Sequence, residues 1–306
     1  IEFLGKKLSA PVMVSGMTGG VDIAEQVNRD IAMAAEELGL AMGLGSQRAM
    51  IENPELQRTY YDRDIAPKML LIGNIGVSHI KNYSIEQLEK MVLDVGADAL
   101  AIHINPAQES MQLEGDTDFS GMLEKINEIS RSFSKPVYVK EVGHGFSREI
   151  AKKISRTNIQ AIDVQGAGGT SWVGIDSLRG RKKLGEVFWD FGVPTVASIV
   201  ECRSAFEGKI IASGGIHTGL DIAKAIALGA DLASIARPVF LAQQSGGKEA
   251  VKEFLEQTIL ELKTAMFLVG ARNIEELKNR PLTFTGKTRQ WLLSRGFEIE
   301  KFGVRK

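Results

Sequence analysis

Short apolar runs alternate with amphipathic segments along almost the whole chain. The runs are continuously apolar rather than alternating, which indicates strands buried on both faces, as in a parallel sheet. They cover residues 11–15, 41–45, 69–73, 99–104, 137–141, 161–164, 209–213 and 232–236. A helical repeat of apolar positions predicts helices between most of them, at residues 24–38, 85–95, 122–132, 148–155, 199–206 and 220–228.

Eight strands that alternate with helices predict an α/β fold of the TIM (β/α)8 barrel type rather than an open sheet. A ninth β-like run, at residues 194–199, is interpreted as the connection into the helix after the sixth strand. Residues 248–269 predict an extra C-terminal helix outside the barrel, and the remaining tail is broken by Pro281, Gly286 and Gly296. Because no linker interrupts the pattern, we expect one domain over residues 1–306.

Composition excludes several classes of protein. The chain has 306 residues, a formal net charge of −1 and one cysteine, Cys202. This balance does not support nucleic-acid binding or a basic membrane patch, and no apolar run reaches the roughly 18 residues that a membrane span needs. A single cysteine excludes an internal disulfide, so we expect a reducing cytoplasm and a buried, unreactive Cys202. Because the chain begins at Ile1, we also expect a segment to be missing before it.

The fourth predicted strand ends in the most informative run of the chain, His-Ile-Asn-Pro-Ala-Gln-Glu at residues 103–109. Residues two apart on a strand share a face, so His103 and Asn105 should point the same way, with Gln108 and Glu109 over the opening. A single histidine in such a place is more often a satisfied core residue. An imidazole, two amides and a carboxylate together are costly to bury unless they meet a ligand.

Two glycine-rich loops and a short segment with an arginine follow three neighbouring strands. The seventh strand leads into Ser-Gly-Gly-Ile-His-Thr-Gly at residues 213–219, the eighth into Ala236 and Arg237, and the sixth into Gly-Ala-Gly-Gly-Thr-Ser at residues 166–171. Loops after strands seven and eight of such barrels often hold a phosphate, because glycine backbone and a helix N-terminus can approach an anion. The alternative is that these glycines serve only tight turns; two adjacent glycine loops favour the phosphate interpretation.

Other strand ends carry small or polar groups, as active-site faces of barrels do. A lysine within an apolar strand is costly without an electron-rich partner, so Lys140 is a candidate site residue. The alternative for Lys140 is a structural lysine paired with Glu141 or Glu109. The remaining candidates at the strand ends are Met17, Thr18, Gly19, Ser46, Gln47, Arg48 and Asn74.

These motifs together resemble type 2 isopentenyl diphosphate isomerase, the flavin-dependent form. The matching stretches fall in the family's order and span almost the whole chain, and the Asn-Pro-Ala-Gln-Glu run is the most specific of them. They lie at residues 4–7, 17–20, 45–48, 103–109, 139–143, 168–172 and 214–216. The resemblance implies a TIM barrel that binds FMN at its C-terminal mouth, uses Mg²⁺ and a reductant such as NADPH, and converts isopentenyl diphosphate to dimethylallyl diphosphate.

The resemblance also implies roles for individual residues. Flavin contacts are expected from Met17, Thr18, Gly19, Ser46, Asn74, Lys140, Gln165 and Thr170, and contacts to the flavin phosphate from Gly215, Ile216, His217, Ala236 and Arg237. Substrate contacts are expected from Ser46, Gln47, Arg48, His103, Asn105 and Gln108, with Glu109 on Mg²⁺. The hypothesis for catalysis is that reduced FMN gives and removes the proton while Gln108, His103 and Lys140 orient and stabilise the reacting groups. Relatives suggest a homo-oligomer, a tetramer or an octamer.

The chain departs from the family at several points. The family's Arg-Lys-x-x-His substrate motif would lie upstream of Leu4, residues 175–185 look short, Gln165 replaces a frequent serine and His217 a commoner arginine. The alternatives are a 2-hydroxy-acid oxidase or dehydrogenase, which needs a His-Arg pair after a late strand, and a non-catalytic flavin- or phosphate-binding protein. A reading like inosine monophosphate dehydrogenase needs a cysteine in the loop after strand six, which has none.

Overall fold

Eight parallel strands close into a barrel in the computed structural model, which describes residues 1–305. Each strand pairs with the next along the chain, and the last pairs with the first. This confirms the predicted TIM barrel, with every predicted strand in place to within three residues of its predicted bounds. The strands are β3 (Val12–Val14), β4 (Ala41–Gly43), β5 (Leu70–Gly76), β6 (Ala99–His103), β7 (Val137–Lys140), β8 (Ala161–Asp163), β9 (Lys209–Ala212) and β10 (Leu232–Ile235).

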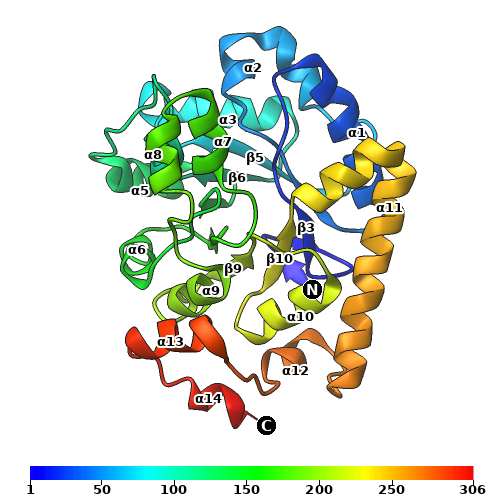
Figure 1. Cartoon of the computed structure of the whole chain (residues 1–306). Coiled ribbons are helices and arrows are strands. Elements are labelled where there is room, and N and C mark those ends of the chain that lie inside the picture. Colours follow the sequence, from blue (N-terminus) through cyan, green and yellow to red (C-terminus); the bar gives the residue numbers. More distant parts are fainter. Residues whose placement is uncertain (306) are drawn as a thin grey trace.

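Helices cover the outside of the barrel (Figure 1). All six predicted helices between strands are present, and capping boxes at Ser84 and Thr218 begin two of them. The helices around the barrel are α1 (Asp22–Leu38), α2 (Arg48–Glu52), α3 (Ile85–Asp94), α5 (Met122–Ser132), α6 (Arg148–Ile154), α9 (Thr195–Arg203), α10 (Gly219–Ala227) and α11 (Arg237–Leu268).

The run at residues 194–199 is the first part of a helix, not an extended connection. Pro194 is the N-cap of α9, which begins at Thr195, four residues before the predicted start. Ala197 to Cys202 are all buried, so this helix lacks the polar face whose repeat marks a surface helix. Its β-branched residues then resemble a strand in sequence.

A hairpin that the apolar pattern does not predict closes the N-terminal end of the barrel. Strands β1 (Glu2–Phe3) and β2 (Lys6–Lys7) pair antiparallel, and Leu4 and Gly5 take positive φ angles of 45° and 81° in the turn. Phe3 and Leu8 pack into the same cluster as side chains from the barrel interior. The chain therefore plugs one end of the barrel and leaves the C-terminal end of the strands for a ligand.

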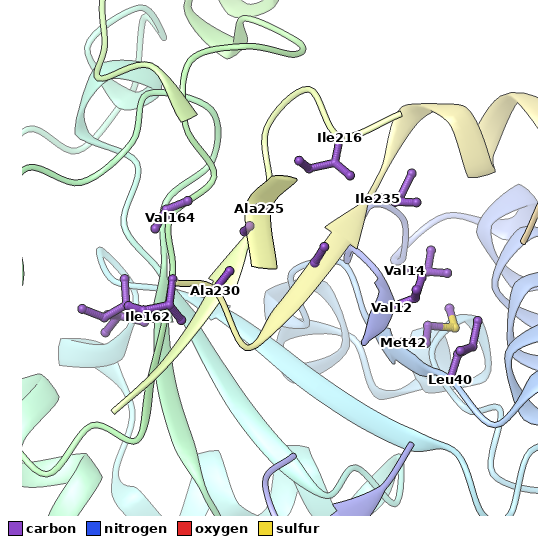
Figure 2. Packing of buried hydrophobic residues seen from close by; sticks show 14 of the residues in the cluster. Val12, Val14, Leu40, Met42, Ile162, Val164, Ile216, Ala225, Ala230 and Ile235 are labelled. Atoms are coloured by element: carbon purple, nitrogen blue, oxygen red, sulfur yellow. The ribbon is translucent and has the colours of Figure 1, made fainter. Parts of the chain in front are cut away.

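Alternate strand residues enter two separate cores. Val12 and Val14 of β3 belong to the large cluster under the helices, whereas Met13 belongs to the cluster inside the barrel. The same alternation holds for the other strands, as a period of two requires. Figure 2 shows Val12, Val14 and Ile235 together on the outer side, with Ile162 of β8 and Val164 just after it further round the barrel.

The C-terminal third of the chain adds helices outside the barrel. The predicted helix at residues 248–269 is present as the second part of α11, which kinks at Gly246 and Gly247 and packs along α1 and α10 (Figure 1). Three short helices follow, α12 (Ile274–Lys278), α13 (Gly286–Ser294) and α14 (Glu300–Gly303). Across residues 1–305, no helix combines the length and the apolar character that crossing a membrane requires.

A buried carboxylate holds α13 against the barrel. Glu201 on α9 is fully buried and accepts hydrogen bonds from Trp291 Nε1 at 2.9 Å, Arg295 Nε at 3.2 Å and the backbone N–H of Arg148 at 2.8 Å. Arg295 also bonds the exposed Glu149. Glu201 thus joins α9, α13 and the start of α6 through one side chain.

Replacing Glu201 with alanine should lower the free energy of unfolding by about 3 kcal/mol, because the partly buried donors of Trp291 and Arg295 lose their acceptor. Urea unfolding of the whole chain measures this. The matched control is Glu149→Ala, which removes the exposed partner of the same Arg295 and should change stability little. Equal losses from the two substitutions would contradict a central role for Glu201.

Candidate active site at the C-terminal end of the barrel

The inward side chains change from apolar to polar at the last position of the strands. On β8, Ala161 lies in the interior cluster and Asp163 follows two residues later; on β7, Tyr138 is followed by Lys140. The strand register places Lys140 beside both His103 and Asp163. The full polar layer is Ser15, Asn74, His103, Lys140, Asp163, Ser213 and Ser234.

Asn74 fixes which ring nitrogen of His103 carries the proton. The amide Nδ2 of Asn74 donates to the carbonyl of Leu44 at 2.9 Å, so its Oδ1 is the acceptor that faces His103 Nδ1 at 2.9 Å. His103 therefore carries its proton on Nδ1 and keeps a lone pair on Nε2. Burial, with the charge of Lys140 nearby, lowers the pKa of His103 to about 3. The imidazole is neutral near pH 7.

Lys140 is buried among oxygen acceptors. Its Nζ donates to the carbonyl of Glu141 at 2.8 Å and to Oε1 of Gln165 at 2.6 Å. Burial lowers the pKa of Lys140, and the charges of Asp163 and Glu141 oppose that shift. The Glu141 carboxylate itself accepts the backbone N–H groups of residues 142, 143 and 144. Across residues 1–305 Lys140 forms no ion pair with Glu141 or Glu109, so the structural alternative does not hold as stated.

Gln165 holds an unusual backbone conformation beside Lys140. Its φ angle is 29°, a left-handed value that costs a non-glycine residue free energy. The half-buried side chain reaches Lys140 from the loop after β8. Strain of this kind is retained where the surroundings fix a residue, which agrees with the predicted place of Gln165 in the site.

Asp163 is a site residue that the sequence analysis missed. The side chain has no exposed surface, its Oδ1 accepts from the Ser213 hydroxyl, and its Oδ2 has no hydrogen-bond partner. Burial raises the pKa of Asp163, an effect that Lys140 opposes. A small cavity inside the barrel is lined by Asp163, Lys140, Tyr138 and Asn74. The spacing of two residues from the buried Ala161 is the signal that could have found it.

Residues 106–109 form a short helix, α4 (Pro106–Glu109), after β6. Asn105 is its N-cap, and Asn105 Nδ2 donates to Gln108 Oε1 at 3.2 Å and to Glu109 Oε1 at 2.8 Å. The other carboxylate oxygen of Glu109 accepts the N–H of Asp116 at 3.0 Å. Asn105 Oδ1 is buried without a partner. The side-chain amide of Asn105 thus orients both Gln108 and Glu109. Asn105 itself lies outside β6, which ends at His103.

The glycine loops meet backbone against backbone. A Cβ at Gly214 would lie 2.1 Å from the carbonyl oxygen of Gly166, and a Cβ at Gly215 would lie 2.2 Å from that of Gly168. The N–H of His217 donates to Asp221 in the capping box of α10. Across residues 1–305, the N–H groups of Gly215 and Ile216 donate to no protein acceptor. These two amides, with the exposed His217 that follows them and the exposed Arg237 after the neighbouring strand β10, fit an anion such as a phosphate.

The remaining predicted residues divide into two groups. Thr18 Oγ1 donates to Asn28, and a Cβ at Gly19 would meet the ring of Tyr60, so this segment after β3 is tightly packed. Gln47 has no exposed surface and its amide bonds the backbone of Asn74 and Met91, which favours a structural role. Partly or largely exposed side chains at the strand ends are Met17, Ser46, Arg48, Thr170 and Ala236.

Glu109 does not belong to a complete protein metal site within residues 1–305. Among the described residues, no three His, Cys, Asp or Glu side chains come together in a group that could hold an ion. Mg²⁺ commonly uses one or two carboxylates and takes its other ligands from water and substrate phosphate. The geometry at Glu109 therefore fits a metal that arrives with an anionic ligand.

Comparisons with known proteins identify the group to which this barrel belongs. The family of FMN-dependent dehydrogenases matches residues 75–283. An isopentenyl-diphosphate delta-isomerase of Methanothermobacter thermautotrophicus is 49% identical over 100% of this chain and 86% of its own length. One from Pyrococcus furiosus is 45% identical over 99% of this chain and 79% of its own.

Solved structures with the same fold are more distant in sequence. A lactate oxidase of Pediococcus acidilactici superposes with a TM-score of 0.70 at 20% identity, covering 94% of this chain and 79% of that one. A mandelate oxidase with an FMN adduct gives a TM-score of 0.66 at 18% identity, covering 91% of this chain and 81% of that one. These two establish the fold alone. By its match to the FMN-dependent family and its identity to the curated relatives, the chain belongs to the type 2 isopentenyl-diphosphate delta-isomerases.

Proposed function

We propose that this chain converts isopentenyl diphosphate to dimethylallyl diphosphate by a 1,3-allylic proton shift, with FMN, Mg²⁺ and a reductant such as NADPH. The observation that carries the proposal is the arrangement after β6. Asn105 binds Gln108 and Glu109 with one amide, next to a neutral His103, in a chain nearly half identical to named isomerases. We further propose that the enzyme is cytoplasmic and acts as a homo-oligomer, a tetramer or an octamer, as the resemblance implies.

The strand ends offer a cradle for FMN. Backbone amides at Gly215 and Ile216 would take its phosphate with His217, Ala236 and Arg237, because the glycines let the backbone approach closely. Its ring would lie among residues from five strand ends, namely Met17, Thr18, Gly19, Ser46, Asn74, Lys140, Gln165 and Thr170. Bound in its reduced form, FMN would supply the acid and base for the proton shift. Lys140, the cation inside the barrel mouth, would stabilise negative charge on the ring.

The protein side chains would position the substrate rather than protonate it. An unactivated alkene is a very weak base, and His103 is neutral because burial holds its pKa at about 3. Asn105 and Gln108 are amides with no proton to give near pH 7. Gln108 would orient the reacting carbons, His103 Nε2 would accept a hydrogen bond, and Ser46 and Arg48 would complete the substrate side, while the buried Gln47 would support them from behind.

Glu109 would bind Mg²⁺ together with the diphosphate. Its two oxygens are already directed by Asn105 and the N–H of Asp116, so the carboxylate is held in place before the metal arrives. A single protein carboxylate is sufficient if diphosphate oxygens fill the remaining positions. This arrangement makes metal binding depend on the substrate.

The test of this function is anaerobic incubation of the full chain with isopentenyl diphosphate, reduced FMN and Mg²⁺ in deuterated water. Deuterium should enter the allylic product, and omission of Mg²⁺ or FMN should abolish its formation. Release of a 2-keto acid from a 2-hydroxy acid, with no allylic product, would instead support the oxidase alternative. Purified chain that takes up no FMN would refute both.

Replacing Gln108 with alanine should lower turnover by about 100-fold, because small misplacements of reacting groups cost rates of that order. FMN affinity should stay within about twofold of the wild type, since Gln108 is assigned to the substrate. Steady-state kinetics and FMN fluorescence titration measure the two quantities. Gln160→Ala, an exposed glutamine before β8 at the opposite end of the barrel, is the matched control and should leave both unchanged. Turnover unchanged in Gln108→Ala would remove Gln108 from the mechanism.

Gly215→Ala should weaken FMN binding by at least about tenfold, a loss of about 1.4 kcal/mol. The added Cβ would lie 2.2 Å from the carbonyl oxygen of Gly168, so the loop would have to move away from it. Gly296→Ala is a matched control, because its φ of +75° is close to the +79° of Gly215 but no atom lies within 4 Å of the added Cβ. If both variants bind FMN equally well, the phosphate is held elsewhere.

A further inference from the structure

Asp163 is a buried acid for which the mechanism above has no use. It lies at the C-terminal end of β8 with no exposed surface, and one of its oxygens accepts from the Ser213 hydroxyl. The second oxygen, Oδ2, has no hydrogen-bond partner. Burying a carboxylate oxygen without a hydrogen-bond partner is destabilising. A protein retains such a group where its charge acts on a neighbouring group.

The nearest opposite charge is Lys140. The two residues are register partners on β7 and β8, and both line the small cavity inside the barrel with Tyr138 and Asn74. Asp163 is the largest electrostatic influence that favours the charged form of Lys140 against burial. The two groups do not touch in this arrangement, because Lys140 Nζ bonds the Glu141 carbonyl and Gln165 instead.

The other groups around this pair cannot replace Asp163. The carboxylate of Glu141 is turned to three backbone N–H groups of the loop after β7. His103 on β6 is neutral, and burial together with the charge of Asp163 raises the pKa of Tyr138 well above its usual value, so the phenol stays protonated. Ser213 on β9 donates to Asp163 and is uncharged. Lys140 and Asp163 are thus the charged pair that faces the cavity.

We propose that Asp163 is the buried counter-ion of Lys140, a positioning residue that keeps the Lys140 ammonium charged at the barrel mouth and so maintains the site's preference for reduced over oxidised FMN as the pH rises. This inference rests on the proposed function. Without Asp163, burial of Lys140 is no longer offset by its main neighbouring anion, and the ammonium loses its proton as the pH rises. The preference for the reduced cofactor then becomes dependent on pH.

The experiment compares Asp163→Asn with the wild type over pH 6.5–9. At each pH, anaerobic titrations give the dissociation constants of oxidised and reduced FMN, and their ratio measures the preference for the reduced form. Dividing the variant's ratio by that of the wild type removes the titration of the flavin itself. At low pH, where Lys140 is charged without its anion, this quotient should exceed one. It should then fall by about tenfold as the pH rises, since one pKa unit is a factor of ten.

Several variants separate this role from a structural one. Asp62→Asn is the matched control, because Asp62 is also buried with an unpartnered Oδ2 but lies before β5, outside the polar layer; its quotient should stay near one. Asp163→Asn in a Lys140→Met background should have a quotient, relative to Lys140→Met alone, that does not change with pH. Asp163→Glu, which restores the charge, should remove most of the pH dependence. If Asp163→Asn gives no soluble protein, Asp163→Ser leaves room for water and provides the same test.

A quotient that is constant or rises across the pH range would overturn the inference. Its failure is distinguishable from failure of the proposed function. A wild type that binds FMN and forms the allylic product while Asp163→Asn has a constant quotient leaves the function standing and removes only Asp163. A wild type that binds no FMN removes both.

Discussion

Closure of the barrel is the constraint on which both the core and the candidate active site depend. Because eight strands meet edge to edge, alternate side chains must point to the helices and to the barrel axis. The outward positions are apolar, whereas the inward positions change from apolar to polar at the last residue of a strand, as in Ala161 and Asp163. A slip of one residue in any strand would exchange the two faces. One register therefore fixes the packing and the chemistry together.

Hydrogen bonds among its own side chains and to nearby backbone groups hold the polar layer, and they orient its side chains before any ligand is present. Asn74 binds the Leu44 carbonyl with one end of its amide and His103 with the other, and Glu141 binds three consecutive backbone N–H groups. The glycine loops at Gly214 and Gly215 add backbone contacts too close for any side chain. Preorganised groups of this kind act without reorganisation during a reaction.

The sequence predicted the strands well because their apolar runs are continuous and flanked by polar loops. It placed the start of α9 four residues late, because burial on nearly all sides removes the helical repeat, and it missed the hairpin of Phe3 and Lys6, which is too short to show a period. Within the site, the motif at residues 103–109 was enough to predict His103, Asn105, Gln108 and Glu109 as candidate residues. Asp163 escaped because a single acid in an apolar run carries no motif, and the internal use of Gln47 depends on contacts with distant backbone.

Uncharged and charged side chains are separated across the barrel mouth, so the proposed substrate and the flavin ring would meet different surroundings. His103 at the end of β6 and the amides Asn105 and Gln108 after it are uncharged, so an apolar alkene placed beside them would meet no hydrated ion. The charged pair Lys140 and Asp163 belongs to the next two strands, where a flavin ring carrying negative charge would be stabilised. Burial enforces this separation, because it keeps His103 neutral while Asp163 offsets the same effect on Lys140. If the carboxylate stood at His103 on β6 instead of at Asp163 on β8, it would draw the Lys140 ammonium toward the substrate and leave the ring without its cation.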